Sequence, residues 1–368
     1  MLYQKPLNDV YMQMPPEEVL RRIGERKEQL GRDLCILGHH YQCDEVFQFA
    51  DLTGDSLKLS RQAAETPAKY IVFCGVHFMA ESADILTPAD RAVILPDLSA
   101  GCGMADMADV DDVVECFEAV ADAAGGAKVV PVTYVNSSAT IKAATGRAGG
   151  ACCTSSNARR VFEWALKSES DGGAGADKIV CIPDQHLGRN TAVAMGYGLG
   201  DCAVYDPGAP GDGLGAEDIR RATFLLWKGH CYVHQRFTVE QIQAARAAVP
   251  GITVMVHPEC PYEVVQASDL SGSTEQILRA VTGAADGTSW AIGTEANMVR
   301  RLAANNPGKY VRSLSEAPSA CVTMARIDPP HLLWVLDRLA AGEVVNRIRV
   351  APAVAEQARV ALDRMIAI

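Results

Sequence analysis

Apolar and polar positions alternate in blocks along the chain, and the blocks predict an α/β fold. Short β-branched runs are typical of buried parallel strands, and longer amphipathic stretches between them are typical of helices. The apolar runs at 34–37, 129–135 and 252–256 each end in polar residues. A second glycine-bearing or polar strand end follows in each case, near 72–75, 179–184 and 292–295.

Capping signals predict where helices begin. Pro15-Pro16-Glu17-Glu18 opens the first helix with proline and acidic residues, and Gly31 closes it. Turns at 54–56, 154–157 and 272–275 precede helical stretches, and we expect a hydroxyl at each N-cap. Such turns expose backbone N–H groups and suit phosphate or carboxylate. Two more helices are expected at 329–341 and 352–367.

These features recur three times in the same order, and a cysteine closes each repeat. His39 precedes Cys102 by 63 residues, and His257 precedes Cys321 by 64. Cys231 closes the middle repeat. Similar spacing predicts an internal structural repeat. The middle repeat is longer because of Gly/Ala/Pro-rich inserts at 172–176 and 206–215, which we expect to be surface loops.

Composition narrows the class of protein. Apolar residues make up 48% and charged residues 21% of 368 residues, which is typical of a globular chain large enough for several domains. The net charge of −11 disfavours a nucleic-acid groove. The start of the chain lacks the apolar core of a signal peptide, and no apolar run reaches the ~20 residues of a membrane span. We therefore expect a cytoplasmic protein whose twelve cysteines are reduced.

The closing cysteines suggest a metal centre. Three α/β units around one axis would bring Cys102, Cys231 and Cys321 together, and three thiolates suit an iron–sulfur cluster. One iron of a [4Fe–4S] cluster would then lack a protein ligand, as a Lewis acid requires. A buried structural thiol is the alternative for each, but their equivalent positions favour ligands. The other nine are interpreted as structural: Cys35, Cys43, Cys74, Cys116, Cys152, Cys153, Cys181, Cys202 and Cys260.

Histidines at strand ends are the candidates for acid–base chemistry. His39 lies beside Tyr41, and His257 lies beside Glu259. Imidazole in ordinary surroundings has a pKa close to neutrality, which suits general acid–base catalysis, and we expect this of both pairs. His234 follows Cys231 by three residues, so on a turn it would face the same site.

These motifs together resemble the quinolinate synthase family over essentially the whole chain, and their order makes the resemblance specific. The matching segments are 38–42, 54–57, 73–81, 100–105, 134–136, 153–158, 183–188, 257–259, 272–274 and 293–295. The resemblance implies three pseudo-symmetric three-layer αβα units around a central active site. The expected boundaries are 1–112 for the first unit with an N-terminal helix, 113–236 for the second with its inserts, 237–325 for the third, and 326–368 for C-terminal helices packed on the body.

The resemblance also implies a reaction and a site. The family condenses iminoaspartate with dihydroxyacetone phosphate to quinolinate, phosphate and water in de novo NAD biosynthesis. Its cluster ligands correspond to Cys102, Cys231 and Cys321, for one [4Fe–4S] cluster per chain. The implied catalytic residues are His39, Tyr41, His234, His257 and Glu259. The implied substrate-binding residues are His39, Ser56, Tyr134, Asn136, Ser155, His257, Glu259, Ser273 and Thr274. Transient contact with L-aspartate oxidase is a further expectation.

One departure and several alternatives stay open at this point. Some family members carry a C-x-x-C-x-x-C run at the third ligand, but Val322-Thr323-Met324 follows Cys321 here. A radical S-adenosylmethionine enzyme of the diphthamide-forming type would share three units and one cysteine per unit, but would need fewer acid–base groups. A non-enzymatic iron–sulfur sensor or electron carrier would not need three anion-binding turns. A nucleotide-binding protein would be expected to show a glycine-rich phosphate motif, and this chain has neither common form.

Overall fold

The computed structural model describes residues 4–209 and 213–368 and divides into two compact units. The first unit contains the chain up to Cys102 together with Ala320–Ala351. The second contains Gly103–Ser319 together with Pro352–Ile368. Part of the predicted insert at 206–215 lies outside the described residues, because 210–212 are not described.

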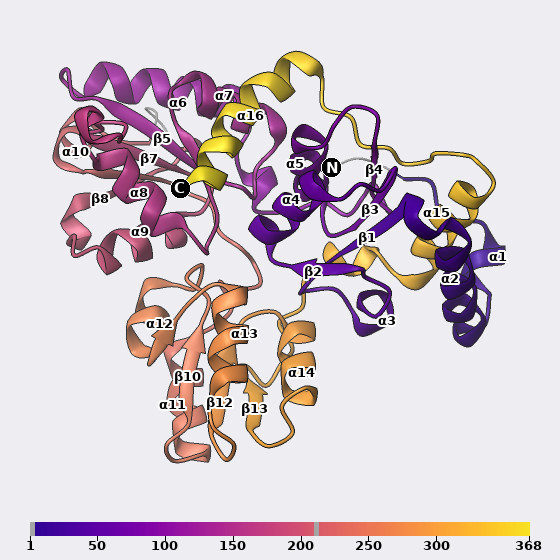
Figure 1. Ribbon diagram of the computed structural model, residues 1–368. Coiled ribbons are helices and arrows are strands. Elements are labelled where there is room, and N and C mark those ends of the chain that lie inside the picture. The colour runs from indigo at the N-terminus through magenta and orange to yellow at the C-terminus, as the bar shows by residue number, and fades with distance from the viewer. Residues whose placement is uncertain (1–3, 210–212) are drawn as a thin grey trace. The chain divides into compact units, whose positions relative to one another are not determined.

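The first unit is built on a four-stranded parallel sheet with the order β2-β1-β3-β4 (Figure 1). Its strands are β1 (Leu34–His39), β2 (Leu52–Gly54), β3 (Tyr70–Cys74) and β4 (Ala92–Ile94). Its helices are α1 (Asp9–Met12), α2 (Pro16–Leu30), α3 (Asp44–Phe47), α4 (Ser56–Glu65), α5 (His77–Leu86) and α15 (Pro329–Ala340).

The second unit contains two parallel sheets. The larger has the order β6-β5-β7-β9-β8, with β5 (Val129–Tyr134), β6 (Ala151–Cys153), β7 (Lys178–Ile182), β8 (Cys202–Tyr205) and β9 (Phe224–Trp227). The smaller has the order β11-β10-β12-β13, with β10 (Thr253–Val256), β11 (Leu270–Ser271), β12 (Ser289–Gly293) and β13 (Tyr310–Ser313). The remaining helices are α6 (Val110–Ala123), α7 (Ala139–Arg147), α8 (Ala158–Leu166), α9 (Gln185–Ala194), α10 (Ala216–Arg221), α11 (Val239–Ala248), α12 (Tyr262–Ala267), α13 (Thr274–Gly283), α14 (Ala296–Ala304) and α16 (Pro352–Ala367).

The first three strands have the same order in all three sheets, which confirms the predicted α/β fold and its repeat. In each sheet the first strand lies between the second and the third. The direction of progression across the sheet therefore reverses beside β1, β5 and β10. In open α/β sheets, ligands bind at the carboxyl ends of strands at such reversal points. The polar residues that follow these three strands lie at these edges.

The C-terminal helices pack on different units. Helix α15 packs along α2, where Arg22 and Arg26 donate to the carboxylate of Asp337 over 2.7 and 2.6 Å. Helix α16 packs along α7, and the carbonyl oxygen of Met365 accepts a 2.9 Å bond from Nδ2 of Asn157. The boundaries near 112, 236 and 325 stay predictions.

Two of the expected hydroxyl N-caps are wrong. Asp55 caps α4, where its carboxylate accepts from the N–H of Lys58, and Ser56 is the first helical residue. Asn157 precedes α8 without a side-chain capping bond. Only Ser273 caps its helix as expected, in a capping box with Gln276. The carboxylate is the stronger acceptor at the first turn, which explains its place before α4.

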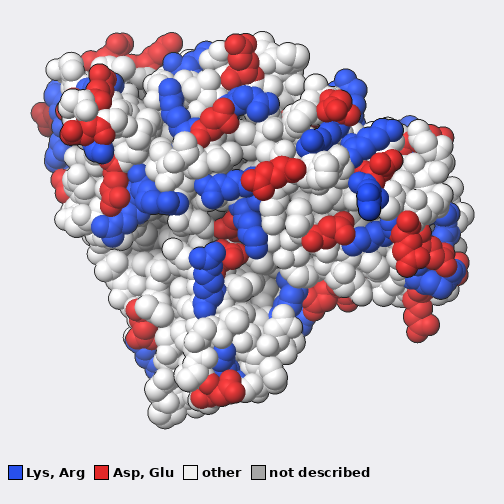
Figure 2. Space-filling view, in the orientation of Figure 1, with Lys and Arg blue, Asp and Glu red and all other residues white. Residues whose placement is uncertain are grey.

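The charged side chains on the surface are of mixed sign. On the face drawn in Figure 2, Lys and Arg are interleaved with Asp and Glu, so positive charge is not concentrated there. Within residues 4–209 and 213–368, we find no helix that combines the length and apolar character needed to cross a bilayer.

We predict that Gly146→Ala destabilises the second unit. A Cβ at Gly146 of α7 would lie 2.1 Å from the backbone oxygen of Gln357 in α16, so the helices would have to separate. Overpacking of this kind costs about 1–3 kcal/mol, measured as a lower urea midpoint by circular dichroism. Gly24→Ala in α2 is the matched control, because its Cβ meets nothing within 4 Å. An unchanged midpoint for Gly146→Ala would contradict the close packing of α7 on α16.

Candidate active site

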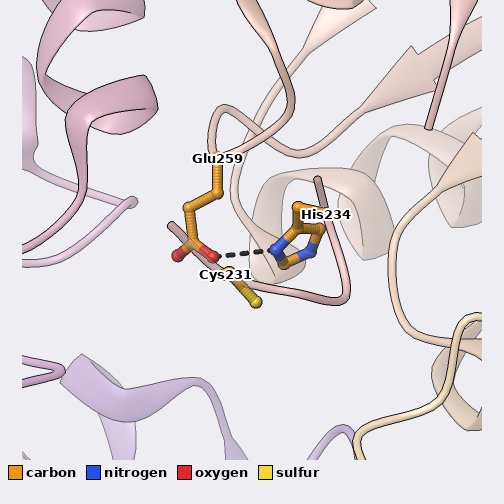
Figure 3. Close-up of side chains that lie close together, drawn as sticks. All are labelled: Cys231, His234 and Glu259. Carbon is orange, nitrogen blue, oxygen red and sulfur yellow. Dashed lines mark hydrogen bonds and ion pairs between the residues drawn. The ribbon is translucent and has the colours of Figure 1, made fainter. Parts of the chain in front are cut away.

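Three side chains with metal-binding atoms converge in the second unit (Figure 3). They are Cys231 and His234 on the turn after β9, and Glu259 on the loop after β10. The backbone N–H of His234 bonds to the carbonyl oxygen of Cys231 over 3.1 Å, which shapes this turn. The candidate ligand atoms of the three residues all lie within 4.8 Å of one another. His234 therefore lies close to Cys231, and its place in a common site stays a prediction.

Glu259 is the centre of a buried polar network. Its Oε2 accepts from Nδ1 of His234 over 2.8 Å, and its Oε1 accepts from the hydroxyl of Tyr134. Nε2 of His234 lies 3.1 Å from the hydroxyl of Thr294. Burial alone would raise the pKa of Glu259, but His257, His234 and the two hydrogen bonds outweigh it and lower the pKa to about 2. Glu259 is therefore a carboxylate that fixes the ring of His234.

His257 is held as a neutral imidazole. Its Nδ1 accepts from the backbone N–H of Glu259 over 3.3 Å, which leaves the proton on Nε2, 3.2 Å from Oγ of Ser155. Its ring stacks on that of His234 at 4.3 Å. Burial and the neighbouring His234 lower the pKa of His257 to about 3. The expectation of a near-neutral pKa is thus wrong for His257, because the side chain is desolvated.

His39 repeats this local arrangement in the first unit. The backbone N–H of Tyr41 bonds to Nδ1 of His39 over 3.2 Å, just as Glu259 bonds to His257. The rings of His39 and Tyr41 meet edge to face at 4.8 Å. The two predicted acid–base pairs therefore occupy equivalent positions at the carboxyl ends of β1 and β10.

Predicted substrate-binding residues of the second unit lie at the start of α13 and in the segment after β5. Oγ of Ser156 donates to Oγ of Ser273 over 2.9 Å, and Thr274 begins α13. Oδ1 of Asn136 is buried and has no hydrogen-bond partner among the described residues. A buried amide oxygen without a partner is costly, so a ligand is the natural donor to it.

The three candidate cysteines occupy equivalent loop positions. Each lies seven residues before the N-cap of the next long helix, and these caps are Asp109, Thr238 and Asp328. The carbonyl two residues before each cysteine accepts from the first N–H of another helix: His77 to Ala100 (2.8 Å), Gln185 to Gly229 (3.0 Å) and Ala296 to Ser319 (3.0 Å). One backbone motif thus presents all three thiols.

The donor chemistry of these cysteines fits a thiolate-bound metal group. Cys102, Cys231 and Cys321 are partly exposed. Burial raises the pKa of each of the other nine thiols and so disfavours the thiolate that a metal requires. The interpretation of Cys35, Cys74, Cys152, Cys153 and Cys181 as buried strand residues is confirmed.

The predicted residues divide between the two units. In the second unit, contacts join Tyr134, Ser155, Cys231, His234, His257 and Glu259. The same unit also holds Asn136, Ser273 and Thr274. The first unit holds His39, Tyr41, Ser56, Cys102 and Cys321. The assignment of the two groups to one site stays a prediction.

Sequence reasoning missed three residues of the network. The hydroxyl of Thr294 contacts His234. Oδ1 of Asp184 caps α9, and burial together with the nearby Glu259 raises the pKa of Asp184 well above the usual range. Nδ2 of Asn190 donates to the carbonyl oxygens of Pro258 and Cys260, both over 2.9 Å. It thereby clamps the backbone on both sides of Glu259. Thr294 and Asp184 lay within matched motifs, but nothing in the pattern around Asn190 indicated this long-range contact.

Parallel strands that end in a buried histidine, glutamate and tyrosine network define an α/β enzyme. A protein-family model described as "Quinolinate synthetase A protein" matches residues 21–367. The quinolinate synthase of Acidobacterium capsulatum is 53% identical over 363 residues, covering 98% of this chain and 95% of that protein. That of Streptomyces coelicolor is 52% identical over 355 residues, covering 95% and 88%, and that of Bacillus anthracis is 49% identical over 362 residues, covering 98% and 96%. The chain belongs to the quinolinate synthetase A family, and the radical-enzyme and sensor alternatives are not favoured.

We predict that Asn190→Asp loosens the loop that carries Glu259. The change removes both donors and leaves two buried carbonyls unsatisfied, which costs about 1–3 kcal/mol. The melting temperature should fall, and the Cys260 amide, bonded to the carbonyl of His257 over 3.0 Å, should exchange faster with solvent deuterium. Asn306→Asp is the control, because Nδ2 of Asn306 bonds to the carbonyl oxygen of Leu302, within its own helix end. Unchanged exchange at Cys260 would show that Asn190 is not a clamp.

Proposed function

We propose that this chain is a quinolinate synthase: it condenses iminoaspartate with dihydroxyacetone phosphate and releases phosphate and water in de novo NAD biosynthesis. Membership of the family supports the reaction. The observation that carries the proposal is the buried network of Tyr134, Glu259 and His234, stacked on His257. A metal carrier or sensor has no need for a buried acid–base network of this kind.

We propose that Cys102, Cys231 and Cys321 hold one [4Fe–4S] cluster. Their partial exposure and shared backbone motif support this assignment. When bound, a cluster with one iron free of protein ligands supplies a Lewis acid for loss of a hydroxyl group.

The histidines of the second unit would divide the proton chemistry. The carboxylate of Glu259 orients His234, as a third group orients the base in other catalytic networks. His257 carries its proton on Nε2 and is neutral, so it would donate a hydrogen bond to an oxygen that gains negative charge. A neutral imidazole with a lowered pKa polarises a carbonyl in this way in triosephosphate isomerase. His39 and Tyr41 form the second proposed pair, from the first unit.

The hydroxyl and amide groups would bind the anionic parts of the substrates. Ser273 and Thr274 lie at the N-terminus of α13, where backbone N–H groups and the helix dipole favour phosphate or carboxylate. Ser155 would share the substrate with His257, and the unpartnered Oδ1 of Asn136 would accept from a substrate donor. Ser56 would serve the first unit at the start of α4.

Location and partner are also proposals. A cytoplasmic location would keep the cysteine thiols reduced, as an iron–sulfur cluster requires. Transient contact with L-aspartate oxidase would deliver the unstable iminoaspartate directly.

We predict that the protein purified without oxygen binds about four irons and forms quinolinate from oxaloacetate, ammonia and dihydroxyacetone phosphate. Cys102→Ala should lose both the cluster spectrum and the product, because a ligand is removed. Cys202→Ala is the matched control: this thiol is also partly exposed but lies outside the proposed set. A Cys102→Ala protein with a full complement of iron would refute the ligand assignment, and a loaded enzyme without product would refute the reaction.

We predict that His257→Ala keeps its iron and loses activity by about 10²–10⁴-fold, the usual contribution of a positioned proton-transfer or donor group. Iron content and kcat are measured on the same sample. His331→Ala is the control, because His331 pairs with Asp328 at the start of α15. Full activity of His257→Ala would remove His257 from the scheme.

A further inference from the structure

We propose that Cys231, His234 and Glu259 form a binding site for a single divalent cation of the zinc class, distinct from the use of Cys231 as a cluster ligand. The site would supply one thiolate, one imidazole nitrogen and one carboxylate oxygen. This donor set is typical of zinc, with a fourth position left for water.

The spacing of the donor atoms suits one ion. All candidate ligand atoms lie within 4.8 Å of one another, and Nδ1 of His234 lies 2.8 Å from Oε2 of Glu259. Tetrahedral coordination at zinc–ligand distances of 2.0–2.3 Å places neighbouring donor atoms about 3.3–3.5 Å apart. An ion can therefore replace the proton between Nδ1 of His234 and Oε2 of Glu259 if these two atoms move apart by about half an ångström.

The remaining atoms of two ligands already have the partners that metal sites require. A metal-bound histidine usually bonds through its other ring nitrogen to an oxygen, and Nε2 of His234 lies 3.1 Å from the hydroxyl of Thr294. The second carboxylate oxygen of Glu259, Oε1, accepts a hydrogen bond from the hydroxyl of Tyr134. Side chains of His234 and Glu259 are 1% and 3% exposed, so they are held in place before any ion arrives.

The site is complete within one compact unit. All three donors belong to Gly103–Ser319, whereas Cys102 and Cys321 belong to the other unit. An ion can thus bind without the other two cysteines. Because both metal groups would use Sγ of Cys231, zinc in this site excludes the cluster. Only this exclusion rests on the proposed function; the ion site itself does not.

The test is cation binding by the full-length, cluster-free protein under reducing conditions. We expect one Zn²⁺ per chain by competition with a chromogenic chelator, and one Co²⁺ with a sulfur-to-cobalt charge-transfer band. The double variant Cys102→Ala/Cys321→Ala should keep both signals, although it cannot assemble the proposed cluster. His234→Ala and Glu259→Gln should each weaken binding by about 100-fold or more, and Thr294→Val, which keeps all three ligands, by about tenfold.

Cys202→Ala is the control and should bind as the parent protein does. Loss of the ion in Cys102→Ala/Cys321→Ala would overturn the proposal, since the ion would then need the three cysteines. Parent-like affinity in Glu259→Gln and Thr294→Val, both close in shape to the native residues, would also overturn it. Failure of the proposed function would be seen separately, as a cluster-loaded enzyme that forms no quinolinate whatever its zinc affinity.

Discussion

The buried carboxylate of Glu259 is the constraint on which the second unit depends. A buried charge is tolerated only where hydrogen bonds and opposite charge replace water. Glu259 accepts hydrogen bonds from Tyr134 at the end of β5 and from His234 on the turn after β9. Asn190 of α9 holds the backbone on both sides of Glu259. The two sheets of this unit must keep their relative position for the network to be satisfied. The same contacts that stabilise the unit therefore orient its reactive groups.

The three repeats share a backbone and differ in side chains. After β1 and β10 the same local bond runs from a backbone N–H to Nδ1 of a histidine, but the neighbour is Tyr41 in one repeat and Glu259 in the other. In the middle repeat, Tyr134 and Asn136 stand at the corresponding positions at the end of β5. The cysteine loops are more uniform, because the same carbonyl-to-helix bond forms before all three thiols. A repeated scaffold thus combines equivalent cysteine positions with unlike polar groups.

Agreement between pattern and structure was greatest where local physics decides. The helix expected from its proline, acidic start and closing glycine is α2, Pro16–Leu30 with Gly31 as its C-cap. The N-cap predictions failed where a hydroxyl had a competing neighbour or a competing partner. Asp55 rather than Ser56 caps α4, and Ser155 bonds to His257 rather than capping α8. A hydroxyl near a helix start can serve the helix or the site, and only the neighbours available in three dimensions decide which.

The sequence alone determined the α/β class, the threefold repeat, the strand ends that carry polar groups, and the three cysteines that close the repeats. These follow from hydrophobic periodicity and spacing, which act over tens of residues. Only the tertiary structure decided that His257 is neutral, that Glu259 is ionised, and that Asn190 and Thr294 belong to the network. Protonation depends on desolvation and on partners up to 125 residues away, as between Tyr134 and Glu259. A local sequence pattern does not indicate such contacts, because only folding brings together residues that lie far apart in the chain.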